Sequence, residues 1–185
     1  MLNDIQSDAK EQMESAINAL KKNLATIRTG RASPSLLDNV RVDYYGSKSP
    51  LSQVANVTVQ DASMLIVKPW EKGLLGEVEK GIFEANIGLS ASNDGEVVRV
   101  PIPPLSEERR REFVKMAKSR AEDAKVSVRN ARRDANDMLK SAQKDGDISE
   151  DDEKRGLKAI QDLTDGYVKE VDEVCSKKEA EIMEV

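Results

Sequence analysis

The apolar residues of this chain follow a helical period over three long stretches. They return every three or four positions from Asp4 to Thr29, from Glu107 to Lys144, and again after Ser149. This spacing places apolar side chains on one face of a helix, so the sequence predicts three long helices, each with one face to bury. The expected apolar seam of the second helix consists of Phe113, Ala117, Ala121, Ala124, Val128, Ala131, Ala135, Met138 and Ala142.

The segment between the first two helices has a different pattern. Val40–Tyr45 alternates between apolar and polar residues, which is typical of a half-buried strand. Further strands are expected at 55–59, 64–68 and 96–100, and a short helix at 74–84, with Leu74, Leu75, Val78, Ile82 and Phe83 as its apolar residues. We therefore expect a small α/β unit at residues 31–105.

The ends of these elements predict how they are connected. Gly30 is placed to cap the C-terminus of the first helix, where a positive φ carries little cost. The prolines of the 101–105 segment make a stiff, extended connector. The chain thus crosses twice between the helices and the small unit, at Gly30–Arg31 and at Pro104–Leu105, and a double connection of this kind permits a hinge.

No single helix can bury its seam alone, and the turn at 145–149 pairs the second helix with the third. The first helix must then complete a bundle. The predicted fold class is α+β. It is a discontinuous three-helix bundle, residues 1–30 and 106–185, with an inserted small α/β domain, mostly β, at residues 31–105.

Composition narrows the function classes. The chain has no histidine, which excludes histidine-based acid–base catalysis and ordinary zinc sites. The single Cys175 cannot form an internal disulfide and is expected to be a small buried apolar residue. No glycine-rich phosphate loop is present, so the chain is not expected to hydrolyse GTP. We therefore expect a protein that is not an enzyme and that needs no cofactor.

The sequence also predicts the compartment. The first thirteen residues lack a basic region and a continuous apolar run, so we expect no signal peptide. No apolar segment reaches the 18 residues that a membrane span requires. Together with the lone cysteine, these features predict a cytoplasmic protein that has no membrane partner.

The charge distribution singles out the second helix. The net charge of the chain is −5, but residues 107–145 carry twelve basic and eight acidic residues, and residues 146–185 carry six and thirteen. Most of the cations of the second helix form a basic stripe along one side, interrupted by Glu122 and Asn136: Arg111, Lys115, Lys118, Lys125, Arg129, Arg132, Arg133, Lys140 and Lys144. A ligand responds to the charges within about 8 Å more than to the total. The stripe therefore predicts a rod that docks on a polyanion.

Arg129, Arg132 and Arg133 are the strongest candidates for binding RNA. They occupy one sector of the helix, and guanidinium groups bind phosphates through two hydrogen bonds at once. The alternative is a solvated face on which Asp134 and Asp137 neutralise the arginines locally.

Three further arginines are candidates for contact with RNA. Arg28 and Arg31 flank the expected helix end, where they could clamp RNA or merely neutralise the helix C-terminus. Arg110 lies in the first turn of the second helix, an unfavourable place for a cation, and could instead pair with nearby acids.

Two other groups of residues favour structural roles. Tyr44, Tyr45 and Trp70 could stack on bases, but no basic groove surrounds them, so we expect them to pack within the small domain. The acidic clusters at 150–153 and 172–173 lie at a helix start and on a solvated face. They lack the ligand arrangement of a cation site, and no metal site is expected.

Five blocks of sequence together resemble the bacterial ribosome recycling factors: Ile27–Asp38, Val42–Gly46, Arg99–Arg110, Val128–Asn136 and Ile148–Asp152. The resemblance implies an L-shaped protein with a three-helix arm and a smaller α/β arm. It further implies action after termination, when messenger RNA and deacylated tRNA remain on the ribosome.

In that family the helical arm binds ribosomal RNA of the large subunit, the smaller arm cooperates with elongation factor G, and together they split the ribosome into subunits. The cluster of Arg129, Arg132 and Arg133 is similar to the ribosome-binding cluster of the family. We expect a monomer. The residues alone leave one alternative, a helical-bundle adaptor or chaperone that binds a protein partner through its acidic third helix.

Overall fold

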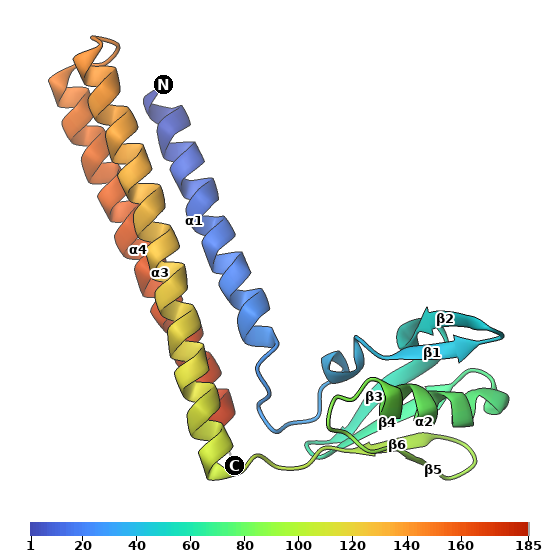
Figure 1. Ribbon diagram of the computed structural model, residues 1–185. Helices are drawn as coiled ribbons and strands as arrows, with labels where there is room; N and C mark the ends of the chain where they lie inside the picture. Colours follow the sequence, from blue (N-terminus) through green and yellow to red (C-terminus); the bar gives the residue numbers. More distant parts are fainter. Residues whose placement is uncertain (185) are drawn as a thin grey trace. The chain divides into compact units, whose positions relative to one another are not determined.

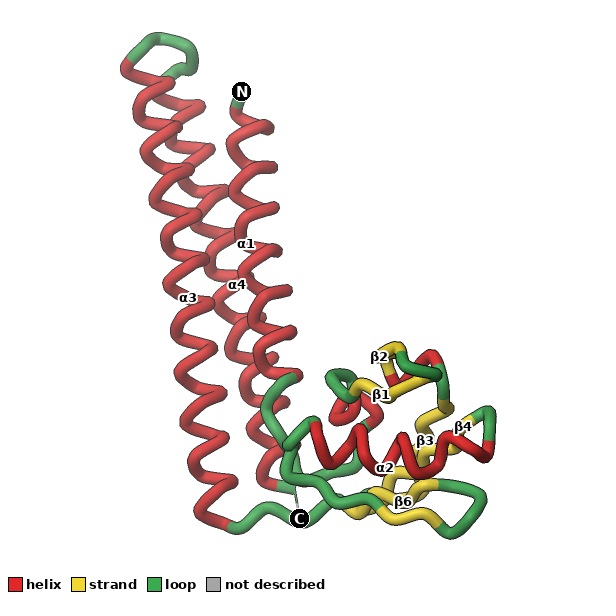
Figure 2. The backbone as a smooth tube through the Cα atoms, turned by 45° about the vertical axis from the view of Figure 1, so that its right-hand side comes forward, coloured by secondary structure: helices red, strands yellow, loops and turns green. Residues whose placement is uncertain are grey.

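The computed structural model describes residues 1–184 and divides them into two compact units. The first unit comprises residues 1–29 and the chain from Glu107 onward, and the second comprises Gly30–Ser106. The first unit contains three long helices, α1 (Leu2–Ala25), α3 (Glu107–Lys144) and α4 (Glu150–Met183), which lie side by side (Figures 1 and 2). The second unit contains two antiparallel sheets and the short helix α2 (Leu75–Glu84). The predicted α+β fold with a three-helix bundle is confirmed.

Small side chains on α3 hold the bundle together. The buried face of α3 consists of Ala117, Ala121, Ala124, Val128, Ala131, Ala135, Leu139 and Ala142, which we call the alanine seam. Larger apolar side chains from α1 and α4, among them Met13, Leu20 and Ile160, fill the space beside it. Because most of the seam carries only a methyl group, the neighbouring helices can lie close to α3.

One position of the expected seam is wrong. Met138 is 49% exposed, whereas the side chain of Leu139 is fully buried. From Ala135 the seam advances by four residues rather than three, because a 3.6-residue period alternates between the two steps. The Leu139 side chain lies against Gly156 of α4, where a Cβ atom would come within 2.8 Å of Leu139 Cδ2.

The first helix also ends earlier than expected. Its last residue is Ala25, and the Thr26 hydroxyl donates a hydrogen bond to the carbonyl of Asn23 at 2.7 Å. Thr26 and Ile27 are β-branched, and a threonine hydroxyl competes with the backbone for hydrogen bonds, so both residues favour ending the helix here. Gly30 has the expected positive φ of 76° but lies beyond the helix end, so its prediction as the helix cap is wrong.

The second unit is built on a four-stranded antiparallel sheet. Its strand order is β3 (Ala55–Asp61), β4 (Met64–Pro69), β6 (Val98–Pro101), β5 (Ser92–Asn93). In its centre Leu65 pairs with Val100 and Val67 pairs with Val98, and all four side chains are fully buried. Three short 3-10 turns, Pro34–Leu37, Leu51–Gln53 and Lys72–Leu74, connect the elements.

A separate hairpin, β1 (Arg41–Tyr44) with β2 (Ser47–Pro50), packs against α2. The approach is close at Gly81 of α2, because a Cβ atom there would lie 2.6 Å from the carbonyl oxygen of Arg41. The sequence pattern did not predict β2 or β5. Both are short strands at sheet edges, and Ser47–Pro50 offers no apolar alternation.

The expectation for the aromatic residues is wrong for Trp70 and holds only in part for Tyr45, whose ring packs edge-on against Tyr44 and whose hydroxyl donates a hydrogen bond to Glu71 at 2.7 Å. Tyr44 is half-buried beside the core of this unit, but Tyr45 is 81% exposed and Trp70 is 67% exposed. Tyr45 occupies the hairpin turn with a φ of 50°, and Trp70 follows Pro69 on the outward-facing side of the strand alternation. Phe83 of α2, which we expected to be an apolar contact, is also exposed.

Over residues 1–184, none of the helices combines the length and the apolar character needed to cross a bilayer.

The alanine seam gives a direct test of this packing. Leu139→Ala should lower the free energy of unfolding by about 2–5 kcal/mol, since it opens a cavity opposite Gly156. Met138→Ala, at the adjacent exposed position, should change it by no more than about 0.5 kcal/mol. Urea unfolding followed by circular dichroism measures both, and equal losses would contradict the packing of α3 described above.

Candidate nucleic-acid interface

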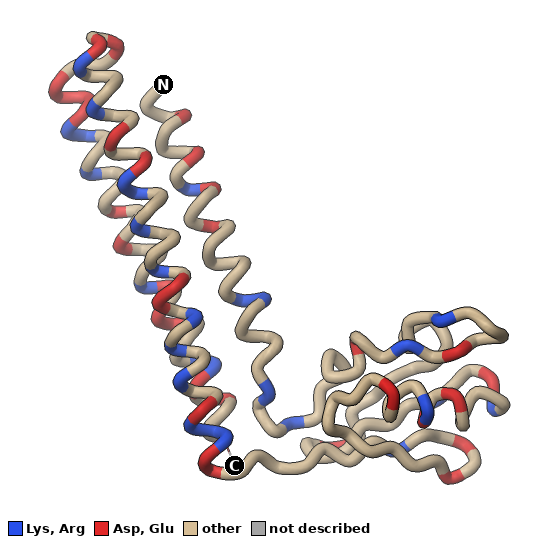
Figure 3. Tube along the Cα trace, in the orientation of Figure 1, with Lys and Arg blue, Asp and Glu red and all other residues tan. Residues whose placement is uncertain are grey.

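The basic stripe lies on a single unbroken helix. α3 is 38 residues long, which corresponds to roughly 57 Å at 1.5 Å per residue. Lysines and arginines recur along its whole length, as the blue segments in Figure 3 show. Because one helix carries all of these cations, their spacing is fixed by the helix and by its packing on α1 and α4.

Arg129 and Arg133 are exposed, and Arg132 is half-buried at the edge of the bundle. Among residues 1–184, none of the ion pairs or side-chain hydrogen bonds involves these three guanidinium groups. The local neutralisation by Asp134 and Asp137, which we had considered as the alternative, is therefore not seen. The cluster keeps its charge and its hydrogen-bond donors available for an external anion.

Lys125 differs from the other members of the stripe. Its side chain is 16% exposed, and its Nζ lies 2.6 Å from a carboxylate oxygen of Asp172 on α4 and 3.5 Å from one of Glu122. The hydrogen bond to Asp172 raises the pKa of Lys125 above its ordinary value. Lys125 thus joins α3 to α4, and its inclusion in a polyanion-binding stripe is wrong.

Arg110 makes neither an ion pair nor a side-chain hydrogen bond within the described chain. It is half-buried, and its Nε is buried without a partner. The neighbouring arginines form the ion pairs with the nearby acids instead: Arg109 pairs with Glu112, and Arg111 pairs with Glu107. The alternative in which Arg110 pairs with those acids is therefore not seen.

Arg28 is half-buried in the segment that follows α1. Over residues 1–184 its side chain has no hydrogen bond or ion pair, so it does not bond to the last carbonyls of α1. Arg31 is exposed and interacts with another part of the chain.

The candidate residues form two groups rather than one. Within the first unit, the end of α1 and the start of α3 lie at the same end of the bundle, which places Arg28 and Arg110 there (Figure 1). Arg129, the nearest member of the other cluster, is 19 residues further along α3 than Arg110, or roughly 28 Å. An anion that touches both groups must therefore be extended, as a nucleic acid backbone is.

The helix α4, which packs against α3, carries a net negative charge, whereas α3 carries a net positive charge. α4 carries eleven carboxylates and six cations, and its first turn is capped by the Ser149 hydroxyl, which accepts a hydrogen bond from the Asp152 amide at 3.1 Å.

In the described part of the chain no group of acidic or cysteine side chains is arranged to hold a metal ion. Burial raises the pKa of the Cys175 thiol to about 11, which makes it a poor nucleophile.

Sequence reasoning missed a groove that is lined by α4: Ala159, Asp162, Leu163, Gly166, Tyr167 and Glu170. One signal was available, because Gly166 stands in the middle of a helical pattern and glycine weakens a helix. Sequence reasoning also missed Tyr167 as a link between helices. Its hydroxyl donates a hydrogen bond to Glu14 of α1 at 3.0 Å.

The fold and the site define a class of protein: a slim helical bundle in which Arg129, Arg132 and Arg133 of α3 make no ion pair among residues 1–184. Comparison with known proteins identifies the family within that class. A family model described as "Ribosome recycling factor" matches residues 20–183. The chain belongs to the ribosome recycling factor family, as its motifs predicted.

Similar proteins match over almost the whole chain. The ribosome-recycling factor of Bacillus licheniformis is 50% identical over 185 residues and covers 100% of both chains. That of Burkholderia mallei (strain SAVP1) is 54% identical over 182 residues, 98% of each.

Two solved structures are similar in fold. A solution structure of the ribosome recycling factor has a TM-score of 0.77 at 39% identity, with 100% of this chain and 98% of that chain covered. The second has a TM-score of 0.65 at 40% identity over 100% of both chains. It shows the T. thermophilus ribosome recycling factor and the E. coli elongation factor G bound to the E. coli post-termination complex.

The role of Lys125 as a link between α3 and α4 can be tested by its effect on stability. Lys125→Met should lower the free energy of unfolding by about 0.5–1 kcal/mol, since it removes the link between α3 and Asp172. Lys115→Met, at an exposed position of the stripe without an ion pair among residues 1–184, should change it by less than about 0.5 kcal/mol. Denaturant unfolding of the two variants checks the difference. The reverse order would show that Lys125 is not a structural link.

Proposed function

We propose that this protein splits the post-termination ribosome into subunits together with elongation factor G, and that it holds the large subunit by binding ribosomal RNA. The proposal combines membership of the ribosome recycling factor family with the partners of the similar T. thermophilus factor. The observation that carries the RNA contact is the cluster of Arg129, Arg132 and Arg133, whose guanidinium groups make no ion pair within the described chain.

The arrangement of the cluster suits a phosphate backbone. Consecutive phosphates of an RNA strand present charges at regular intervals, and arginines on one helix sector present donors at fixed intervals. Arg28 and Arg110 extend the proposed contact to the end of the bundle where α3 begins. Arg31, which follows Arg28 by three residues, is proposed to bind the same RNA. Binding of this kind releases counterions, so it weakens steeply as the salt concentration rises.

The proposed mechanism is mechanical rather than catalytic. The bundle, residues 1–30 and 106–185, grips RNA of the large subunit, and the inserted unit, residues 31–105, cooperates with the GTPase. A bundle held by a continuous seam transmits force without bending, so a push on the inserted unit reaches the gripped RNA. In this scheme the protein acts as a monomer in the cytoplasm and has no chemical step of its own.

The hinge of this mechanism is proposed at Gly30, Arg31, Pro104 and Leu105. Gly30 and Leu105 are in contact, because a Cβ atom on Gly30 would lie 3.2 Å from Leu105 Cγ and 3.3 Å from its amide nitrogen. The φ of 76° at Gly30 is one that residues with a side chain rarely adopt. Together the close approach and the positive φ favour glycine at this crossing and support its role as the pivot.

Cosedimentation with isolated large and small subunits across a salt series tests the proposal. The protein should bind the large subunit selectively, and Arg132→Ala should weaken that binding about tenfold or more, since a hydrogen bond to a charged group contributes roughly 1.5–3 kcal/mol. The slope of log affinity against log salt should fall by about one. The fold should persist, because alanine is a strong helix former.

Arg155→Ala on α4 is the matched control, because it removes the same side chain from the opposite, acidic helix. It should leave binding and slope unchanged. If both variants behaved alike, or if the protein bound neither subunit, the proposed RNA contact would be wrong. Salt-independent binding would instead favour the adaptor class.

A further inference from the structure

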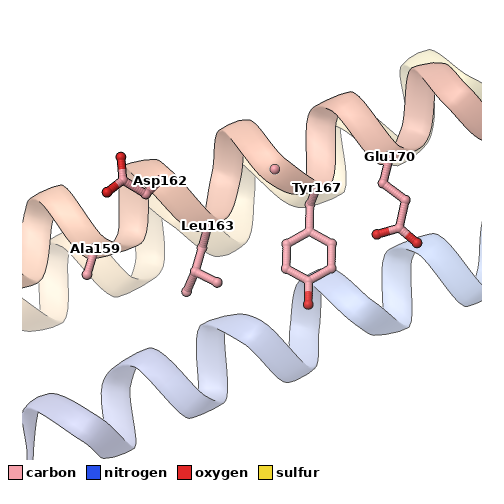
Figure 4. Close-up of a pocket in the computed structure, with 6 residues that line it drawn as sticks. Ala159, Asp162, Leu163, Tyr167 and Glu170 are labelled. Carbon is pink, nitrogen blue, oxygen red and sulfur yellow. The ribbon is translucent and has the colours of Figure 1, made fainter.

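The groove on α4 is not used by the function proposed above. It has a volume of about 620 Å³ and runs along the side of α4 that faces α1, with Leu163, Tyr167 and Glu170 pointing toward α1 (Figure 4). A smaller hollow of about 200 Å³ shares Tyr167 and Glu170 with it and is otherwise lined by α1 residues. The two hollows are therefore neighbours that lie on either side of Tyr167 and Glu170.

The floor of the groove is made of small and apolar residues. Ala159, Leu163 and Gly166 follow one another at helical spacing on the same side of α4. They span eight residues, or roughly 10 Å from the first to the last, which is about two helical turns. An open apolar floor of this length matches the contact that one packed helix makes with another.

Gly166 is the informative residue of this floor. Glycine in a helix interior costs about 1 kcal/mol relative to alanine. At Gly81 and Gly156 the chain itself requires the glycine, because a Cβ atom would lie 2.6 Å from Arg41 and 2.8 Å from Leu139. At Gly166, as at Gly76 of α2, no heavy atom of the described chain outside the neighbouring residues and the helix's own backbone lies within 4 Å of the position of a Cβ atom. The described part of the chain therefore does not require a glycine at position 166, and the open space there can admit the backbone of a partner helix.

Tyr167 and Glu170, which form the side of the groove next to α1, are already held by α1 in the free protein. The Tyr167 hydroxyl donates its hydrogen bond to Glu14, and Lys21 of α1 lies 3.7 Å from Glu170. Burial of Tyr167, together with its hydrogen bond to Glu14, raises the pKa of the Tyr167 hydroxyl to about 12. This hydroxyl therefore keeps its proton at neutral pH. A partner therefore meets a preformed surface, which lowers the entropy cost of binding.

The charge around the groove selects its occupant. Asp162 is exposed at the rim and has no ion pair within the described chain, and α4 as a whole carries eleven carboxylates against six cations. A nucleic acid is repelled by such a surface, whereas lysine and arginine side chains are attracted. We propose that the α4 groove, floored by Ala159, Leu163 and Gly166, is a docking site for a lysine- or arginine-rich amphipathic helix of a partner protein.

The test uses the full chain, labelled with ¹⁵N, and a designed peptide of about 18 residues, long enough to form a helix. The peptide carries alanines on one face and lysines on the flanks of that face. Its binding should shift the amide signals of Ala159, Leu163 and Gly166. Gly166→Leu should weaken binding at least tenfold, because the side chain fills the floor. Ser176→Leu, also exposed on α4 but outside the groove, should leave it unchanged.

A second pair of variants tests the charge. Asp162→Asn should weaken binding about two- to fivefold, as expected for one exposed charge pair worth roughly 0.5–1 kcal/mol. Asp165→Asn, which removes the same charge three residues away and outside the groove lining, should have a smaller effect. Both positions are exposed, so both variants should fold.

Several results would overturn the proposal. Equal binding of a peptide with the same composition in scrambled order would show attraction by charge alone. Shifts spread over the acidic face of α4, or no shifts at the groove, would also contradict it, as would an RNA oligonucleotide that, without the peptide, shifts the same groove amides. A concentration-dependent dimer that Gly166→Leu abolishes would assign the groove to a second copy of this chain. None of these outcomes depends on whether the protein splits ribosomes.

Discussion

The packing of α1 and α4 against the alanine seam of α3 is the constraint on which the helical unit depends. Methyl groups at Ala121, Ala131 and Ala135 leave room for bulky side chains from the neighbouring helices, Leu20, Met13 and Ile160 respectively, to complete a thin core. A bundle this thin leaves most positions facing water. This explains how a chain with 34% charged residues can still bury a continuous seam.

The same geometry sorts the charges into different roles. Lys125 lies at the edge of the seam, so it is close enough to Asp172 to join two helices. Arg129 and Arg133 lie further round the helix and make no ion pair with α4 or with any other residue among 1–184. On α4, the acids Asp162 and Glu170 line part of the groove. The two helices thus carry charges of opposite sign, positive on α3 and negative on α4, although the net charge of the chain is only −5.

The sequence predicted the helices, which depend on the period of apolar residues. It did not predict the features that depend on contacts between residues far apart in the chain. The bounds of α3 are those expected, because its apolar period is long and unbroken. The end of α1, the exchange of Met138 for Leu139 and the exposure of Trp70 depend on single steps of the period, which the pattern does not resolve. The pairing of Lys125 with Asp172 joins residues far apart in the chain, so no local pattern reveals it. The motifs identified the family, while the roles of the single arginines remain predictions.

The central claim is that α3, and not α4, faces the RNA. It is tested most directly by hydroxyl-radical cleavage from an iron chelate tethered to a single cysteine, with the buried Cys175 replaced by serine. From Val126→Cys, exposed on α3 close to Arg129, the chelate should cut ribosomal RNA of the large subunit strongly. From Ser176→Cys on α4 it should cut that RNA weakly or not at all. Strong cleavage from α4 with little from α3 would contradict this account of the protein.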